Sequence, residues 1–210
     1  MKRLLLLFCI FVSFIGSICA QTARQKEELD ALKDLYTLVE DGTKVRYTQV
    51  YEDLGKPKEV LYEGLVNFFK NRDERSSDFK YREENNTIIL TFQMSYDNVY
   101  SHVGLGHNYF LSMVVNWRID IKDNRLRAIV DLTDYTQVHR DKTGILQKEY
   151  TDVVPLCVVP PFDKVKKEKH NEMYAQAFIN AANKTKYLFY YLNESFKMLI
   201  KRAPDADTDW

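Results

Sequence analysis

Apolar and polar residues alternate with a period of two through the middle of the chain, from Asp78 to Thr136. This period is typical of β-strands with one buried and one exposed face. Turn-forming residues interrupt it at Asn85 and Asn86 and again at Asp123 and Asn124, and Asn124 is suited to a positive φ. We therefore expect four antiparallel strands, from Phe79 to Glu83, from Thr87 to Tyr96, from Tyr109 to Ile121 and from Leu126 onward, with a loop from Asp97 to Asn108.

Three other segments have the 3.6-residue period of an amphipathic helix. They run from Thr22 to Asp41, from Lys58 to Asn71 and from about Glu168 to Arg202, and a β-prone segment, Lys44 to Tyr51, follows the first. A sheet that is apolar on one face needs a cover, which the second and third helices can supply. Around Lys186 the third helix is apolar on several sides, so we expect the N-terminal helix to contact it there.

The order of these elements predicts an α+β fold. Its antiparallel sheet would have about five strands, covered on one face by two helices, and the N-terminal helix would be an addition. We divide the chain into a signal peptide (1–20), an N-terminal amphipathic helix (21–42), one sheet-and-helix domain (43–202) and a disordered acidic tail (203–210).

The first 20 residues have the pattern of a secretory signal peptide. A short charged start precedes an apolar run from Leu4 to Ile15, and small residues follow up to Ala20, after which we expect cleavage. The protein is then exported to the periplasm or the medium. There are two alternatives, a retained anchor, which would need about 20 apolar residues, and a lipidated Cys19, which would need a small residue where Ile18 stands.

Charge and cysteine content narrow the possible partners. The chain has 30 basic and 30 acidic residues, and cleavage would leave 28 basic ones because Lys2 and Arg3 belong to the signal. Proteins that bind nucleic acid usually have a basic excess, so we expect no nucleic acid partner. Cleavage would also leave Cys157 as the single cysteine, so we expect no internal disulfide in the mature domain. Because the apolar run of the signal would be removed, we also expect no stable membrane span.

Several segments together resemble the exported bacterial domain of unknown function 4468. They are Tyr47–Tyr51, Lys56–Glu63, Phe68–Phe69, Trp117–Arg127 and Asp131–Tyr135. That family is described as TBP-like in fold and occurs mainly in Bacteroidota. The resemblance covers about Lys44 to Ile200 and implies a TBP-like sheet-and-helix domain, but it brings no activity, cofactor or site residues with it.

The connector between Tyr135 and Glu168 is longer than the family leads us to expect. Its part from Asp152 to Lys167 contains three prolines, which keep it out of helices and central strands, yet it is too apolar for a solvated loop. It either packs on its own domain or binds a partner. The possible interaction surface consists of Val153, Val154, Leu156, Val158, Val159 and Phe162.

Candidates for catalysis and metal binding are few. His102 and His107 flank two glycines, but a metal site needs three or four ligands. Cys157 lies in an apolar run, which favours a buried thiol of low reactivity. Asp131 and Asp134 are the acids that a hydrolase would use. No nucleotide-binding or zinc-protease motif occurs, so we expect no cofactor and no metal.

The sequence thus favours a non-catalytic binding or interaction module of the bacterial cell envelope, which holds an envelope protein or glycan on the polar face of its sheet or on the connector. One alternative is a hydrolase with a spatially assembled acid site. The other is a structural subunit that self-associates through an N-terminal stripe of Leu29, Leu32, Tyr36 and Val39.

Overall fold

The computed structural model describes residues 23–40, 42, 44–71, 79–103, 108–141, 143, 145–153 and 168–201. A helix at residues 23–32 comes first. The other elements are η1 (Lys33–Leu35), β1 (Thr37–Val39), β2 (Lys44–Tyr51), α2 (Lys58–Lys70), β3 (Lys80–Glu84), β4 (Thr87–Val103), β5 (Asn108–Lys122), β6 (Arg125–Arg140), β7 (Leu146–Val153) and α3 (Glu168–Lys201). The expected α+β fold is confirmed.

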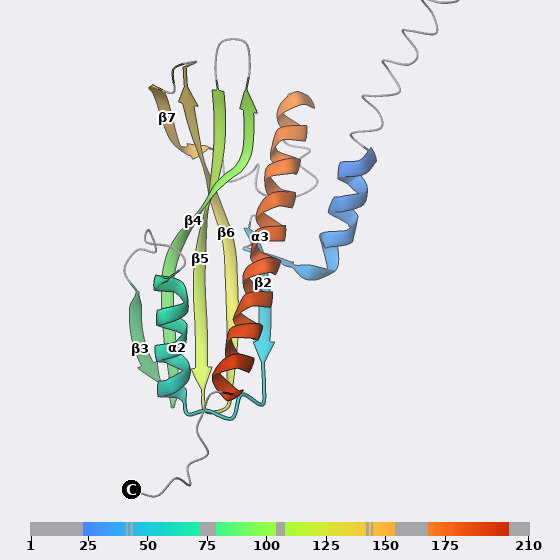
Figure 1. The fold of residues 1–210 in the computed structure, drawn as a ribbon. Helices are drawn as coiled ribbons and strands as arrows, with labels where there is room; N and C mark the ends of the chain where they lie inside the picture. Colours follow the sequence, from blue (N-terminus) through green and yellow to red (C-terminus); the bar gives the residue numbers. More distant parts are fainter. Residues whose placement is uncertain are drawn as a thin grey trace, which may run out of the picture.

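The strands form one antiparallel sheet in the order β1-β2-β6-β5-β4-β3, with β7 also paired to β6. β6 has two neighbouring strands on one side, because its first half pairs with β2 and its second half pairs with β7. Both α2 and α3 lie on one face of the sheet (Figure 1). The sheet has seven strands rather than about five, since β1 and β7 come from segments expected to be helix and connector.

Side chains from both helices and the sheet meet in an aromatic core. The Phe69 ring of α2 lies 4.6 Å from Phe92 and 5.1 Å from Trp117, and Trp117 lies 5.7 Å from Phe189 of α3, measured between ring centroids. Burying an aromatic or large aliphatic side chain stabilises the fold by about 1.5–3 kcal/mol. The inward positions of the strands and the inner faces of the helices therefore hold the sheet and the helix layer together.

The turn between β5 and β6 also fixes the start of α2. Asn124 has the expected positive φ, at 65°. Its N–H donates to the Lys56 carbonyl at 2.8 Å, and its carbonyl accepts from the N–H of Leu54 at 3.0 Å. The Asp123 carboxylate accepts from the N–H of Lys58, the first residue of α2, at 2.9 Å. This contact satisfies one of the backbone donors that a helix leaves free at its N-terminus.

The N-terminal helix ends at residue 32 rather than near Asp41. Leu32 enters the core and Tyr36 packs edge-on against Phe178, but Val39 belongs to β1. The reason is that the hairpin through Glu40 and Gly42, both at positive φ, lets residues 37–39 pair with β2, which satisfies their backbone groups.

Two strands are longer than their alternation predicts. β4 continues from Tyr96 through a bulge to Val103, inside the segment expected to be a loop. The Asn180 amide of α3 donates to the carbonyl of Val99 at 2.7 Å and supports this irregular part. β6 extends to Arg140 because β7 pairs with it. Tertiary contacts therefore extend strands whose local pattern fades.

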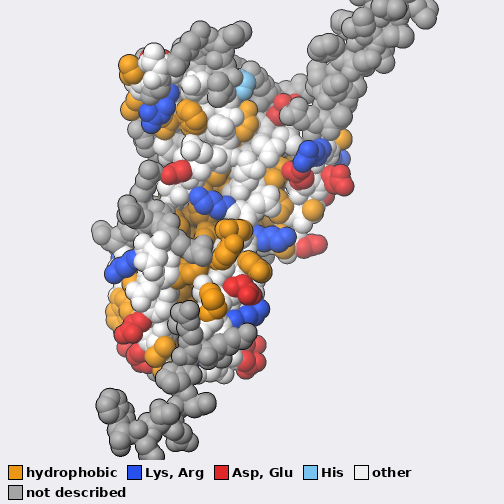
Figure 2. Space-filling view, in the orientation of Figure 1, with side chains coloured by type: hydrophobic (Ala, Val, Ile, Leu, Met, Phe, Trp, Pro, Cys, Tyr) orange, Lys and Arg blue, Asp and Glu red, His pale blue; other side chains and the backbone are white. Residues whose placement is uncertain are grey.

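The N-terminal helix packs against an earlier part of α3 than expected. Gln25 is buried and donates to the carbonyl of Glu172 and to the side chain of Gln176. The tyrosines Tyr187 and Tyr190 remain exposed. Figure 2 accordingly shows hydrophobic side chains gathered over α3 and beside it. Of the helices that are described, none has the length and apolar character needed to cross a bilayer.

Candidate functional site: the outer face of the sheet

The face of the sheet that points away from the helices carries the polar half of the strand alternation. We call it the outer face. Cross-strand neighbours in its lower part, on the side of the β5–β6 turn, form four successive rows. These rows are Glu84, Thr87, Lys122 and Arg125; Arg82, Ile89, Asp120, Arg127 and Val50; Lys80, Thr91, Arg118, Ile129 and Thr48; and Gln93, Asn116, Asp131 and Arg46.

These rows are strongly basic although the whole chain has no net charge. They contain seven cations, Arg46, Lys80, Arg82, Arg118, Lys122, Arg125 and Arg127, and three carboxylates, Glu84, Asp120 and Asp131. All three carboxylates lie within 3.3 Å of an arginine nitrogen. By contrast, Lys80, Lys122 and Arg125 have no carboxylate partner among the described side chains. These four rows of the outer face therefore have an excess of four positive charges.

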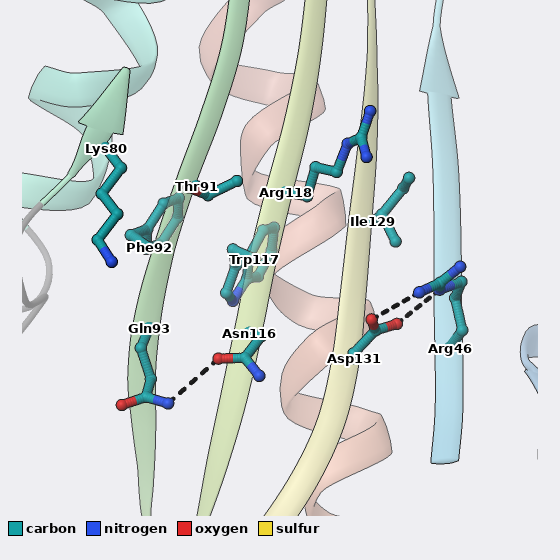
Figure 3. Close-up of a pocket in the computed structure, with 10 residues that line it drawn as sticks. All are labelled: Arg46, Lys80, Thr91, Phe92, Gln93, Asn116, Trp117, Arg118, Ile129 and Asp131. Atoms are coloured by element: carbon teal, nitrogen blue, oxygen red, sulfur yellow. Dashed lines mark hydrogen bonds and ion pairs between the residues drawn. The ribbon is translucent and has the colours of Figure 1, made fainter. Parts of the chain in front are cut away.

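A hollow of about 480 Å³ lies on this face and is lined by residues of five strands, β2 to β6. Arg46 donates two hydrogen bonds to Asp131, at 2.6 and 2.7 Å, and Gln93 donates to Asn116 at 3.1 Å (Figure 3). Lys80 reaches in from β3 and Arg118 from β5. The lining thus combines cations, side-chain amides, the hydroxyl of Thr91 and the carboxylate of Asp131 with three apolar residues, Phe92, Trp117 and Ile129.

A second hollow of about 280 Å³ adjoins the first along β5 and β6. It surrounds Asp120, whose carboxylate accepts from the Nε atoms of Arg118 at 2.8 Å and Arg127 at 3.1 Å. Burial raises the pKa of this carboxyl, but the hydrogen bonds from Arg127 and Arg118 outweigh it and hold the pKa below its ordinary value. Lys122 and Arg125 complete the wall.

The arrangement is better suited to holding an anion than to transferring a proton. Asp120 stays ionised at neutral pH, and Asp131 is held in a two-bond pair by Arg46. Guanidinium groups bind carboxylates through paired hydrogen bonds, and amide side chains both donate to and accept from hydroxyls. An anionic ligand would match the cations of both hollows, and hydroxyl groups on it would match the amides of the first.

The two acids proposed for a hydrolase, Asp131 and Asp134, do not lie together in one hollow. Asp131 lines the first hollow, whereas Asp134 pairs across from Val114, beyond the bulge in β5 and β6, and lines neither hollow. His102 lies in β4 opposite Tyr109, and His107 and Cys157 lie outside the described residues. Within the described part of the chain, no group of three His, Cys, Asp or Glu side chains is placed to hold a metal ion.

The connector remains a prediction. Val153 is the last residue of β7, and Val154, Leu156, Val158, Val159 and Phe162 lie outside the described residues. The sequence predicts, by contrast, that the polar face of the sheet can bind a partner, but we did not predict that cations would gather on this face. The available signal was the four basic residues between 118 and 127, Arg118, Lys122, Arg125 and Arg127, which outnumber the two acids of that segment, Asp120 and Asp123.

The fold and the outer face together define an α+β protein with a one-sided antiparallel sheet and a basic open face. No family model and no curated protein matches the chain. Among solved structures, it is similar to a TBP-like protein from Parabacteroides distasonis ATCC 8503, with 14% identity and a TM-score of 0.47 over 76% of this chain and 97% of that one. It is also similar to a DUF4468 family protein from Bacteroides ovatus ATCC 8483, with 13% identity and a TM-score of 0.41 over 83% and 94%.

Proposed function

We propose that this protein is a non-catalytic binding module of the bacterial cell envelope, which holds an acidic polysaccharide on the outer face of its sheet. The charge of that face supports the proposal. An excess of four cations is gathered on one face of a chain with no net charge, and three of its cations lack a carboxylate partner among the described side chains.

The chemistry of the lining residues favours a sugar acid over a simple anion. Carboxylates of uronic acids can pair with Arg118 and Lys80, while sugar hydroxyls can bond to the amides of Gln93 and Asn116. The two hollows follow one another along β5 and β6, so that successive sugar units of one chain can occupy them. An open face of this kind suits a polymer, since it leaves both ends of the ligand free.

The envelope location rests on the signal-peptide pattern of residues 1–20. Export would also place the basic face where carboxylated polysaccharides occur and where nucleic acids are scarce. The hydrolase alternative gains less support, because the carboxylates of the outer face are bound to arginines rather than poised to exchange protons.

Calorimetric titration of the exported protein with alginate, a carboxylated polysaccharide, tests this proposal, and uncharged dextran serves as the comparison. The site variant is Lys80→Gln with Arg125→Gln, because neither residue has an ion pair to lose among the described side chains. The control variant is Arg24→Gln with Lys26→Gln, which removes two exposed charges from the N-terminal helix.

We expect alginate but not dextran to bind, the site variant to bind roughly tenfold more weakly, and the control to bind like the original protein. Equal binding by the two variants would contradict the proposal. A random-sequence DNA duplex is the second comparison. If it binds as tightly as alginate, the face attracts any polyanion and the assignment to a glycan is wrong.

A further inference from the structure

The cations that remain free for a ligand are not spread evenly over the four rows of the outer face. Lys122 and Arg125 lie in the first row, and Lys80 and Arg118 flank Thr91 in the third (Figure 3). The two lysines and Arg125 have no carboxylate partner among the described side chains. Arg118 donates to a carboxylate through Nε alone, so both of its terminal nitrogens are unbonded within the described residues.

The arginines of the second and fourth rows, by contrast, already have carboxylate partners. Arg127 donates to Asp120 from both Nε and Nη2. Arg46 likewise donates to Asp131 from Nε and Nη2. The third pair joins Arg82 to Glu84 at 3.3 Å. A guanidinium that already makes two bonds to one carboxylate has lost the paired geometry with which it would bind another.

Rows with free cations therefore alternate with rows whose cations are paired. Successive rows are two residues apart along a strand, which is about 7 Å, so the first and third rows are separated by about 14 Å. A single sugar ring is shorter than this distance. A glycan chain along β5 that places one carboxylate at Lys122 and another at Arg118 thus has at least one sugar unit between them.

The position between the two basic rows belongs to Asp120. Its side chain is only 10% exposed, yet it lines the second hollow. The pKa of its carboxyl lies below the ordinary value, so the group is charged at neutral pH. A ligand carboxylate at this position would meet a like charge and would compete with Asp120 for the nitrogens of Arg127. A neutral sugar unit would do neither.

We propose that the outer face selects acidic polysaccharides in which neutral units separate the acidic ones, and that Asp120 is the residue that discriminates against a uniformly acidic chain. This inference rests on the proposed function, because it specifies the ligand of the same site. Specific binding often depends on a repulsive element as well as on attractive ones. A face that simply attracted polyanions would bind more tightly with every further charge on the ligand.

Two forms of one polymer test the proposal. Polygalacturonate carries a carboxylate on every unit, and methyl esterification of about half of its units at random makes those units neutral on the same backbone. In calorimetric titration of the exported protein, with concentrations counted in sugar units, we expect the half-esterified form to bind roughly threefold more tightly. The fully esterified form is the control for the methyl groups and should not bind.

Two charge-removing variants assign the selection to a residue. Asp120→Asn should raise the affinity for polygalacturonate roughly two- to fivefold more than that for the half-esterified form. Glu84→Gln removes the same charge from the same face, but Glu84 lines neither hollow, so the ratio of the two affinities should stay unchanged. A loss of stability in Asp120→Asn affects both polymers alike, and the ratio therefore separates selection from folding.

The outcomes distinguish this inference from the proposed function. If the original protein binds polygalacturonate more tightly than the half-esterified form, the inference is wrong and the proposed function stands. Equal changes of the ratio in Asp120→Asn and Glu84→Gln would assign the effect to overall charge and would also overturn it. If no carboxylated polymer binds, alginate included, the proposed function is wrong and the inference falls with it.

Discussion

The hydroxyl oxygen of Thr185, on α3, lies 3.2 Å from the hydroxyl oxygen of Tyr96, on β4. Both side chains are completely buried, and Thr185 also lies 3.0 Å from the carbonyl of Ala181. A threonine hydroxyl can donate to that carbonyl and accept from the tyrosine. Burial raises the pKa of Tyr96, so its hydroxyl keeps its proton. This contact is a polar link within an apolar core, and it fixes the position of the long helix on the sheet.

Removing one side of this link should destabilise the fold more than removing both. Thr185→Val deprives the Tyr96 hydroxyl of a partner and should lower the free energy of unfolding by about 1–3 kcal/mol. Tyr96→Phe should cost a similar amount, and the double variant should cost clearly less than the sum of the two. Urea unfolding of the four proteins measures this coupling. Strictly additive costs would show that the two hydroxyls do not interact.

The carboxylate of Asp120 should make stability depend on acid pH. Its pKa is lowered in the folded state by Arg127 and Arg118, against the effect of burial. The carboxylate therefore stabilises the fold above its ordinary pKa of about 3.9, and this contribution is lost as the pH falls through the lower, folded-state pKa. Asp120→Asn should cost about 1–2 kcal/mol at pH 7, a modest value because both arginines are half exposed.

Unfolding of Asp120→Asn and of the original protein at a series of pH values checks this sign. The difference between them should be constant near neutrality and should shrink below about pH 4. A difference that grows in acid would mean that the folded state raises the pKa of Asp120. The same variant also frees two arginines on the outer face, so alginate binding should become tighter.

Asp123 should stabilise α2 from outside the helix. It accepts a hydrogen bond from the first N–H of α2, and its charge is favourable near the positive end of the helix dipole. Asp123→Ala should therefore lower the free energy of unfolding by about 1 kcal/mol. Lys122→Ala is the matched control on the same turn and should change stability by less than about 0.5 kcal/mol. If the two variants are equally stable in urea, the cap contributes nothing.

Phe69 should be the residue of α2 on which the sheet depends most. It is fully buried and contacts both Phe92 and Trp117, whereas its neighbour Phe68 is only partly buried. Phe69→Ala should cost about 3–5 kcal/mol and alter the fluorescence of Trp117, because it leaves a cavity beside the indole. Phe68→Ala should cost less. Equal costs would place the centre of this contact elsewhere on the helix.

The sequence was most informative where local pattern and tertiary structure agree. β2, β5 and α2 lie within a residue or two of their expected positions, because period, turn residues and burial all favour the same result. β1 was missed because Thr37 to Val39 continue a helical stripe, and only their pairing with β2 decides the outcome. β7 was missed because its residues are largely polar, and its pairing with β6 has no local signal.

The candidate site was harder to predict than the fold for a similar reason. Arg46 and Asp131 are 85 residues apart in the sequence and meet because β2 pairs with β6. The sequence indicates a polar face, but the register decides which charges are neighbours. Only that register shows that each of the three carboxylates forms an ion pair with an arginine. It also shows that Lys80, Lys122 and Arg125 have no carboxylate partner among the described side chains.

The position of α3 after all the strands of the sheet has a consequence for the timing of folding. β4, β5 and β6 pair with their neighbours in sequence and can form as soon as they are synthesised. The hydrogen bond from Tyr51 to Phe189, by contrast, spans 138 residues and must wait for the last helix. Until then the apolar face around Trp117 has no α3 to cover it. Part of the apolar face of the nascent chain thus stays accessible to chaperones until α3 has been synthesised.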